Sequence, residues 1–502
     1  MDYQAFVDGD KTLLVAPAGY GKTYTIAESL KYTTGRQLIL THTHAGVAAI
    51  KEKIKEFSIA SNRYNVESIS SFAQKYVHAF YTGTDTPDQE NSSEYHPFII
   101  DKATIIFKSN VVRNVIKATY DNLFVDEYQD CTKPQHEMIL TLSECLKTHI
   151  LGDPLQGIFY FNGDLVDLDT DLSGFERVPD LSIPRRWRKA GNNCALGDKL
   201  KEIRSLLEHR NVVDFSSNDI EGLHFIIVNP NDIRDSKSLY RKCLNKLILN
   251  PEKNPDFDSL LIIVPKYVEV KDDGGTVRKG DIKHRAKIRV QIDSSKSLTL
   301  IEAIDDKNFY SIARKIDTLC STIGRSTKPV KKIKEDVLER IFQKSGANLD
   351  NWFNESAIKN KQADTDKIKA KALKRTIDLF ISEPSPSNMN NIILELKNNL
   401  KIKYMREELL YAILNALTHS HLEGISVYEA IKNQRNIIRR SGSKSKGKCI
   451  GTTLLTKGLE FDTVVILDAD KFDCPKHLYV ALTRCCKNLV VFSSQNSLSP
   501  YN

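Results

Sequence analysis

The chain has 502 residues, a formal net charge of +8 at pH 7, 41% hydrophobic residues and 27% charged residues. At roughly 150 residues per domain, this length predicts about three domains. No apolar run approaches the roughly 18 residues that a membrane span needs, and nine cysteines without a Cys-x-x-Cys pair exclude a disulfide scaffold. The first residues carry no basic-then-apolar export signal, so we expect a cytoplasmic protein. The basic balance permits binding to nucleic acid without requiring it.

The first third of the chain alternates short apolar runs with amphipathic segments. Strand-like runs lie at residues 13–15, 37–40, 123–125 and 149–151, and helical patterns follow the first two. Strands that alternate with helices predict a parallel sheet with crossover connections. A polar segment at residues 81–96 predicts an exposed insertion.

A second region of the same kind begins near residue 183. Its strand-like runs are interrupted by a long helical stretch and resume close to the C-terminus. The predicted fold class is therefore α/β, with two parallel-sheet cores and a helical insertion in the second. The expected domains are residues 1–182 with a small insertion near 75–115, 183–308, 309–440 for the helical insertion, and 441–502 for the completion of the second core.

A glycine-bearing loop joins the first strand to the first long helix. It reads Ala16, Pro17, Ala18, Gly19, Tyr20, Gly21, Lys22 and Thr23. Glycines let backbone amides curl around phosphate oxygens, and the start of the following helix favours anions. Lys22 is expected to reach the β- and γ-phosphates of ATP, and Thr23 to hold Mg²⁺.

An acidic pair ends the apolar run at 123–125. Asp126 would be the second ligand of Mg²⁺, and Glu127 would accept the proton of the attacking water. Together with the phosphate loop, these two carboxylates predict hydrolysis of a nucleoside triphosphate.

Four further motifs resemble those of the UvrD/Rep-like superfamily 1 DNA helicases, in the order found in that family. They are Asp126-Glu127-Tyr128-Gln129-Asp130, Gly152-Asp153-Pro154-Leu155-Gln156-Gly157-Ile158-Phe159, Lys457-Gly458-Leu459-Glu460-Phe461 and Tyr479-Val480-Ala481-Leu482-Thr483-Arg484. The resemblance implies two RecA-like P-loop cores and an ATP-dependent 3′→5′ DNA helicase or translocase. Leu454 and Leu455 depart from the family, which usually has polar residues there.

The resemblance also implies roles for single residues in binding and hydrolysing the nucleotide. Gln156 would sense the γ-phosphate, and Arg188 and Arg484 would be arginine fingers, with Arg186 as a competitor for the place of Arg188. The remaining nucleotide-binding residues would be Gln4 at the adenine, Trp187 stacked on the base, Glu460 in contact with the ribose, and Gly458.

For nucleic acid, the expected contacts are hydroxyl groups that grip the strand backbone and aromatic rings that stack on bases. The candidates are Thr41, His42, Thr43, Phe72, Tyr160 and Phe161. A two-histidine metal site at His42 and His44 is a rival interpretation that lacks nearby Cys or carboxylate partners. The basic run 432–448 is either a DNA-facing patch or a solvated linker.

The sequence also resembles the helicase subunit of the Gabija anti-phage system, in its size and in ending directly after the last motif. This resemblance implies DNA as one partner, a separate nuclease as another, and a role in antiviral defence. The helical insertion would either dock that nuclease or regulate strand separation. An alternative from another class is an ATP-switched sensor of DNA or DNA ends that signals to a partner without processive unwinding. A scaffold with a vestigial ATPase is disfavoured, because each catalytic residue type is present.

Overall fold

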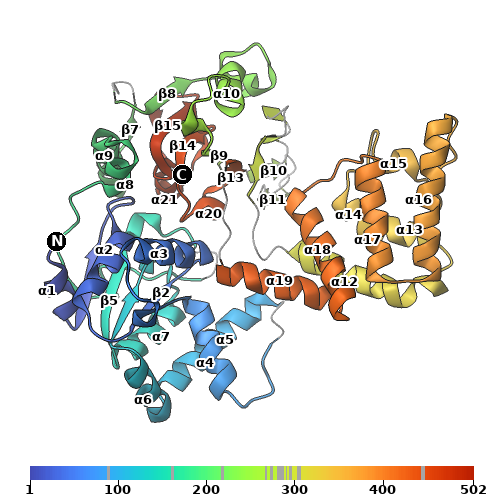
Figure 1. Ribbon diagram of the computed structural model, residues 1–502. Coiled ribbons are helices and arrows are strands. Elements are labelled where there is room, and N and C mark those ends of the chain that lie inside the picture. Colours follow the sequence, from blue (N-terminus) through green and yellow to red (C-terminus); the bar gives the residue numbers. More distant parts are fainter. Residues whose placement is uncertain are drawn as a thin grey trace. The chain divides into compact units, whose positions relative to one another are not determined.

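Two parallel sheets of six strands each carry the larger part of the computed structural model (Figure 1). The first has the order β3-β2-β4-β5-β1-β6 and the second the order β12-β13-β9-β14-β15-β8. The strands of the first sheet are β1 Lys11–Val15, β2 Gln37–Thr41, β3 Tyr64–Ser68, β4 Asn122–Val125, β5 Lys147–Gly152 and β6 Glu176–Arg177. Those of the second are β8 Leu223–Ile227, β9 Leu260–Ile263, β12 Thr299–Leu300, β13 Lys448–Gly451, β14 Phe461–Ile466 and β15 Cys485–Ser493.

The structure describes residues 1–87, 91–159, 163–215, 220–265, 268–271, 275–279, 288–289, 291–292, 297–301, 307–441 and 447–501. They divide into two compact units. Unit 1 comprises Met1–Ile301 and Ser441–Asn502 and holds both sheets, and unit 2 is Glu302–Arg440. Two short antiparallel pairs complete the strands, β7 Val213–Asp214 with β16 Ser497–Leu498 and β10 Val268–Lys271 with β11 Gly275–Lys279.

Both sheets are buried on both faces, as parallel sheets with crossover helices usually are. Along β1, Leu13 and Val15 pack into one apolar cluster while Leu14 packs into another, because successive side chains of a strand point to opposite faces. The cluster around Leu14 is continuous with residues of the second sheet such as Leu261 and Val464. A shared apolar core therefore joins the two sheets within unit 1.

Helices flank the sheets of unit 1. They are α1 Tyr3–Asp8, α2 Lys22–Ser29, α3 His44–Glu56, α4 Ile69–Phe80, α5 Ser92–Phe107, α6 Asn110–Thr119, α7 Lys133–Ser143, α8 Arg185–Gly191, α9 Cys194–Glu208, α10 Leu239–Leu249, α20 Thr453–Thr456 and α21 Pro475–Leu482. The segments from α1 to β6 surround the first sheet and are called the first core. Those from α8 to β12, and from β13 onward, surround the second sheet and are called the second core.

Unit 2 is helical and has an apolar core of its own. Its helices are α12 Lys307–Thr322, α13 Pro329–Ile333, α14 Glu339–Ile341, α15 Leu349–Trp352, α16 Asp364–Ser382, α17 Pro386–Leu394, α18 Glu407–Glu423 and α19 Val427–Ser441. The core cluster around Phe309, Trp352 and Leu417 contains residues of this unit alone. No helix among the described residues of the chain is long and apolar enough to cross a membrane.

The predicted fold class is confirmed: the chain is α/β with two parallel sheets, and a helical segment interrupts the second. Two expectations need correction. The polar segment 81–96 is not wholly exposed, because Tyr95, in α5, is buried. In the basic run 432–448, Arg435 belongs neither to an exposed patch nor to a linker. It is fully buried in α19, where it lies 3.7 Å from the centre of the Phe309 ring and donates to Glu408.

The two tryptophans of the chain provide one fluorescent reporter for each unit. Trp187 lies in unit 1 and Trp352 in unit 2, and both are buried. Because the core of unit 2 shares no residue with the cores of unit 1, we expect two unfolding transitions in urea. Trp187→Phe should report only the unfolding of unit 2, and Trp352→Phe only that of unit 1. Coincident midpoints in the two variants would show a single cooperative unit instead.

Candidate functional site

The glycine-bearing loop lies between β1 and α2, at the carboxyl end of the first sheet. Gly19 and Gly21 have left-handed backbones, with φ of +76° and +107°, which glycine adopts without a steric penalty. The Nζ atom of Lys22 donates to the carbonyl oxygen of Ala16 at 2.9 Å, so the lysine curls back over its own loop. The loop thus brings a buried cation and the amino end of α2 to one place, an arrangement that suits phosphate.

Close packing of α8 against the loop is a second reason for the two glycines. A Cβ atom on Gly19 would lie 2.5 Å from the ring of Trp187, and one on Gly21 would lie 2.6 Å from the side chain of Arg185. Both neighbours belong to the second core. Trp187 is fully buried beneath the loop, and therefore the prediction that it stacks on a nucleotide base is wrong. Its large ring supports the loop from below instead.

Two carboxylates follow β4 and face this loop. Asp126 accepts a hydrogen bond from the Thr23 hydroxyl at 3.2 Å, so these two predicted metal ligands are neighbours. A hydroxyl and a carboxylate are oxygen donors of the kind that Mg²⁺ prefers. At Glu127 the backbone turns left-handed, with φ of +57°, as the chain leaves the strand.

Burial and neighbouring charges push the pKa values of this pair apart. Burial and the charge of Glu127 raise the pKa of Asp126. Burial alone would also raise the pKa of Glu127, but Lys22 and Lys457 lower it overall, with help from a hydrogen bond donated by Gln129. The pKa of Glu127 is therefore the lower of the two, and its carboxylate is available to accept a proton.

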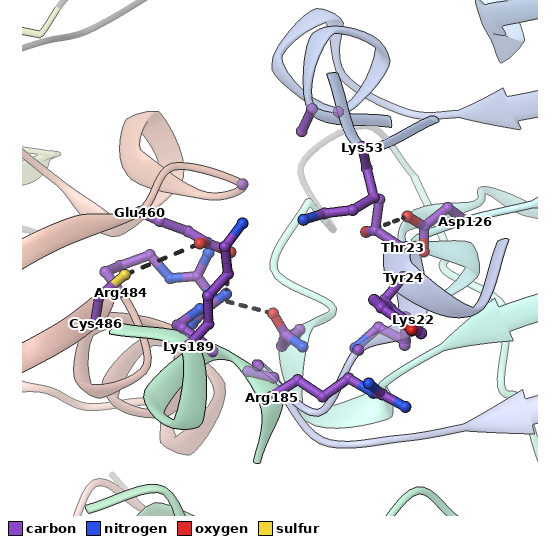
Figure 2. A pocket seen from close by; sticks show the side chains of 18 of the residues that line it. Lys22, Thr23, Tyr24, Lys53, Asp126, Arg185, Lys189, Glu460, Arg484 and Cys486 are labelled. Atoms are coloured by element: carbon purple, nitrogen blue, oxygen red, sulfur yellow. Dashed lines mark hydrogen bonds and ion pairs between the residues drawn. The ribbon is translucent and has the colours of Figure 1, made fainter. Parts of the chain in front are cut away.

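A cavity of about 660 Å³ opens beside these groups and is lined by both cores. Figure 2 shows Lys22, Thr23 and Asp126 on one side of it and Lys189, Glu460, Arg484 and Cys486 on the other. The predicted residues that line it are Ala18, Gly19, Gly21, Lys22, Thr23, Thr43, Asp126, Glu127, Gln156, Arg188, Gly458, Glu460 and Arg484.

Several cations of the second core line this cavity, and three of them are tied to other groups of the site. Arg484 is buried and donates from Nη2 to Oε1 of Gln156 at 3.1 Å. Burial beside Arg186 lowers the pKa of Arg484 to about 10, which leaves the guanidinium charged at neutral pH. Arg186 forms an ion pair with Glu460 at 2.7 Å and donates to the carbonyl oxygen of Thr483. Lys457 is buried, forms an ion pair with Asp130 and also donates to the carbonyl oxygen of Gln156.

Two other residues predicted to bind the nucleotide, Arg188 and Gln4, differ in whether they line the cavity. Arg188 lines the cavity, but its side chain is exposed, whereas the Arg186 side chain is only 10% exposed. Gln4 is exposed on α1, donates to Asp8 at 2.9 Å, and is not part of the cavity lining. In this structure Gln4 is thus not placed to read a base.

Loop residues Ala16, Pro17 and Tyr20 are buried and do not face the cavity. The Tyr20 hydroxyl points to α9, where it donates to the Gly197 carbonyl at 3.3 Å. These residues shape the loop and anchor it to the second core.

Most of the described residues predicted to touch nucleic acid are turned inward. Phe72 is fully buried in an aromatic cluster with Tyr76 and Phe107, so the prediction that it stacks on a base is wrong. Thr41 is fully buried as well, which removes its hydroxyl from the surface. Thr43 caps α3 by accepting a hydrogen bond from the Gly46 amide at 3.0 Å.

His42 lies 3.2 Å from the Cys131 sulfur, and burial together with the charge of Lys457 lowers the pKa of His42 to about 3. The imidazole is therefore neutral. No cluster of three or more His, Cys, Asp or Glu side chains able to hold a metal ion occurs in the described part of the chain. Tyr160 and Phe161 lie outside the described residues.

An aromatic–cation group near the phosphate loop has no counterpart in the sequence predictions. The guanidinium of Arg185 lies 3.8 Å from the centre of the Tyr24 ring and donates to the Tyr3 hydroxyl at 3.3 Å. Arg185 and Tyr24 both line the cavity. A tyrosine directly after Lys22-Thr23 was the available signal, but only the fold shows that an arginine 161 positions away covers it.

Comparisons with known proteins agree with this site. Residues 84–168 match the UvrD/REP helicase N-terminal domain, a range that holds the acidic pair and Gln156 but begins after the phosphate loop. A probable DNA helicase II homolog of Mycoplasma genitalium is 22% identical over 86% of this chain and 63% of its own length. The Gabija protein GajB of Bacillus cereus is 31% identical over 22% of this chain and 23% of its own length.

Two further matches are more partial. The exonuclease/helicase subunit RexA of Lactococcus lactis is 30% identical over 32% of this chain and 13% of its own length. A solved arterivirus helicase, nonstructural protein 10 with DNA, covers 52% of this chain and 48% of its own at 15% identity, with a TM-score of 0.26. The chain thus spans less than two thirds of the length of each of these relatives.

The predicted family resemblance is confirmed: residues 84–168 match the UvrD/REP helicase N-terminal domain, and parts of the chain are similar to a DNA helicase II homolog and to GajB.

Substitutions in the site should separate binding from hydrolysis. Lys22→Ala removes the cation of the phosphate loop and should abolish detectable ATP binding. Glu127→Gln keeps the shape and the neighbouring amide of Gln129 but cannot accept a proton, so ATP should bind within about threefold while turnover falls by roughly 10²–10⁴. Binding of a fluorescent ATP analogue and phosphate release would be measured on both.

The matched control is Glu144→Gln, which removes an exposed carboxylate that pairs with Arg113 away from the cavity and should leave both measurements unchanged. Near-normal phosphate release by Glu127→Gln would show that another group accepts the proton.

Proposed function

We propose that this chain is an ATP-dependent superfamily 1 DNA helicase or translocase. The observation that carries the proposal is the convergence of Arg186, Arg484 and Lys457, from the second core, on the cavity that holds Lys22 and Glu127 of the first. A triphosphate bound to the loop would be in reach of cations on both cores. Its binding and loss would therefore change the attraction between the cores, which is how hydrolysis becomes coupled to motion.

The site fits ATP with Mg²⁺. Thr23 and Asp126 would hold the metal ion, which when bound neutralises charge on the phosphate oxygens. Lys22 would release the Ala16 carbonyl and turn to the phosphates. Glu127 would accept the proton of the attacking water, while the side-chain amide of Gln156 would sense the γ-phosphate.

For the arginine fingers, the geometry supports Arg484 together with Arg186 rather than Arg188. Arg186 is held on two sides, by Glu460 and by the Thr483 carbonyl, whereas Arg188 is exposed. A finger must keep its position to act on a transition state, because its contribution depends on geometry. Glu460, for which the family resemblance implies a contact with the ribose, would release Arg186 to the phosphates when they enter.

The nucleic acid would be single-stranded DNA or duplex with single-stranded ends, and movement would run 3′→5′. The family carries this part of the proposal, since the relatives include a protein named as a DNA helicase II homolog. Tyr160 and Phe161 remain the sequence-based candidates for base stacking. The other aromatic candidate, Phe72, is buried, so stacking would fall on Tyr160 and Phe161.

A separate nuclease is the proposed protein partner, in defence against foreign DNA. Two kinds of relative support it, namely GajB, a Gabija protein, and RexA, an exonuclease/helicase subunit. The helical unit 2 is the proposed docking surface. It carries exposed apolar side chains on α16, including Ile368 at 71% exposure.

DNA dependence tests the motor directly. We expect single-stranded DNA to raise the ATPase rate at least tenfold, and a 3′-tailed duplex to be unwound in preference to a 5′-tailed one. Binding should weaken steeply with salt, because released counterions make log affinity fall by about 0.7 per phosphate contacted for each unit of log salt.

In the same assays, Phe161→Ala should reduce the stimulation by DNA more than the basal rate. An ATPase stimulated by DNA that separates no strands with either tail would favour the ATP-switched sensor. An ATPase indifferent to every nucleic acid would contradict both functions.

The partner proposal predicts that a nuclease co-purifies when the chain is expressed with its neighbouring reading frames. Ile368→Asp should reduce the amount of co-purified nuclease. The matched control is Ile105→Asp, which changes an isoleucine of 57% exposure on α5 of unit 1 and should leave it unchanged. Should no nuclease accompany the wild-type chain, the partnership would be wrong. If Ile368→Asp instead alters strand displacement and keeps the nuclease bound, unit 2 regulates unwinding.

A further inference from the structure

The carboxylate of Asp153 lies at the centre of a buried hydrogen-bond network beside the cavity. Its side chain is fully buried and follows β5 at the start of the short 3₁₀ helix Pro154–Gln156. Its Oδ2 atom accepts from Nε2 of Gln156 at 2.9 Å. Its backbone amide donates to Oε1 of Gln129 at 2.9 Å, and Gln129 in turn donates to Glu127. Asp153 therefore contacts the Gln156 amide directly and is linked to Glu127 through Gln129.

An ionised carboxylate can only accept hydrogen bonds, which fixes the orientation of the Gln156 side chain. The NH₂ group must face Asp153, and Oε1 must then face the Nη2 atom of Arg484, at 3.1 Å. With the amide reversed, NH₂ donors would face the guanidinium, and a carbonyl oxygen would face the carboxylate. The charge of Asp153 thus determines which end of the sensor amide meets the arginine.

A buried carboxylate requires a partner, and α9 of the second core supplies it. Arg204 donates to Oδ1 of Asp153 from Nε at 3.3 Å and from Nη2 at 3.1 Å. Glu208, one turn further along α9, holds the same guanidinium at 2.9 Å. The pair with Asp153 crosses from the second core to the first and is nearly dry, since the two side chains are 15% and 0% exposed. Neither residue lines the cavity.

We propose that Arg204 is a positioning residue for ATP hydrolysis, acting through Asp153 on the amide of Gln156. This inference rests on the proposed ATPase function and adds to it a second mechanical link between the cores. Arg484 donates to the oxygen of the Gln156 amide, while Arg204 fixes the nitrogen of that amide through the carboxylate of Asp153. A shift of α9 relative to the first sheet is transmitted to the sensor amide, because the hydrogen bonds in between are direct.

The test compares variants that remove the charge on one side or on both. Arg204→Gln leaves Asp153 buried without its cation, so the protein should lose both stability and turnover. Asp153→Asn is close in shape but presents a donor as well as an acceptor, so Gln156 is no longer oriented. The double variant Asp153→Asn with Arg204→Gln removes both charges of the buried pair and leaves only the partly exposed Glu208 without its cation, so its Tm should recover toward the wild type.

For Asp153→Asn and for the double variant we expect the DNA-stimulated kcat to fall at least tenfold, with the KM for ATP within about threefold. Small misplacements of catalytic groups cost up to about 10²-fold. Arg204→Lys should restore part of the kcat. The control Lys199→Gln removes a cation of α9 that pairs with Glu202 and should match the wild type.

The outcomes separate this inference from the proposed function. A double variant that recovers both Tm and kcat would show that the pair only stabilises the fold, and would overturn the positioning role. So would Asp153→Asn with a wild-type kcat, or a fall in kcat accompanied by an equal loss of ATP binding. A wild-type chain that hydrolyses no ATP would overturn the ATPase function and the positioning role with it. Wild-type hydrolysis with unaffected variants would overturn the positioning role alone.

Discussion

The rest of the site depends on opposite charges, contributed by two different sheets, that are buried against each other. Lys457 of the second core pairs with Asp130 of the first, and both side chains are almost fully buried. Such a pair is costly to desolvate and stabilises a fold only where its remaining hydrogen bonds are satisfied. Lys457 meets this condition through the Gln156 carbonyl and the ring face of Phe159. A slide of the cores past each other would leave these charges buried without partners, so the pairing also enforces the register of the cores.

If the chain has the proposed ATPase function, the same charges would let a triphosphate act on the structure. A nucleotide entering the cavity brings negative charge to cations already engaged with protein groups, namely Lys22 with a carbonyl, Arg484 with Gln156 and Arg186 with Glu460. Each must exchange one acceptor for another. Because these acceptors belong to different elements, the exchange redistributes attraction across the boundary between cores. Relative motion would then be an electrostatic consequence of binding.

Sequence reasoning succeeded where chemistry depends on a short run of residues in a fixed backbone setting. The phosphate loop and the pair Asp126-Glu127 follow buried strands, and parallel strands bring their carboxyl ends to one edge of a sheet. In the first sheet β5 separates β1 from β4, which brings Gln156 to the same edge. Local pattern and topology together were therefore enough to predict both the fold class and which groups meet.

The predictions that failed concern whether a side chain is buried or exposed, and burial is decided by segments far away in the sequence. Trp187 is buried because the phosphate loop lies on it, and Phe72 because α5 covers it. Arg435 carries a charge and yet packs on Phe309, since α12 and α18 enclose it. An aromatic or basic residue in a motif reveals its chemistry, whereas its exposure depends on tertiary packing that no local pattern records.

The two glycines of the phosphate loop meet two constraints at once. One comes from the local backbone conformation and the other from packing against the second core. Positive φ alone would account for Gly19 and Gly21 as features of a loop that binds phosphate. The nearness of Trp187 and Arg185 adds a requirement that the first core by itself does not impose, since any Cβ would push α8 away from the loop. α8 also carries Arg186, so the space left by a missing side chain in one core helps to set where a cation of the other core stands. The cavity is therefore a property of both sheets together, and residues that do not line it are part of what forms it.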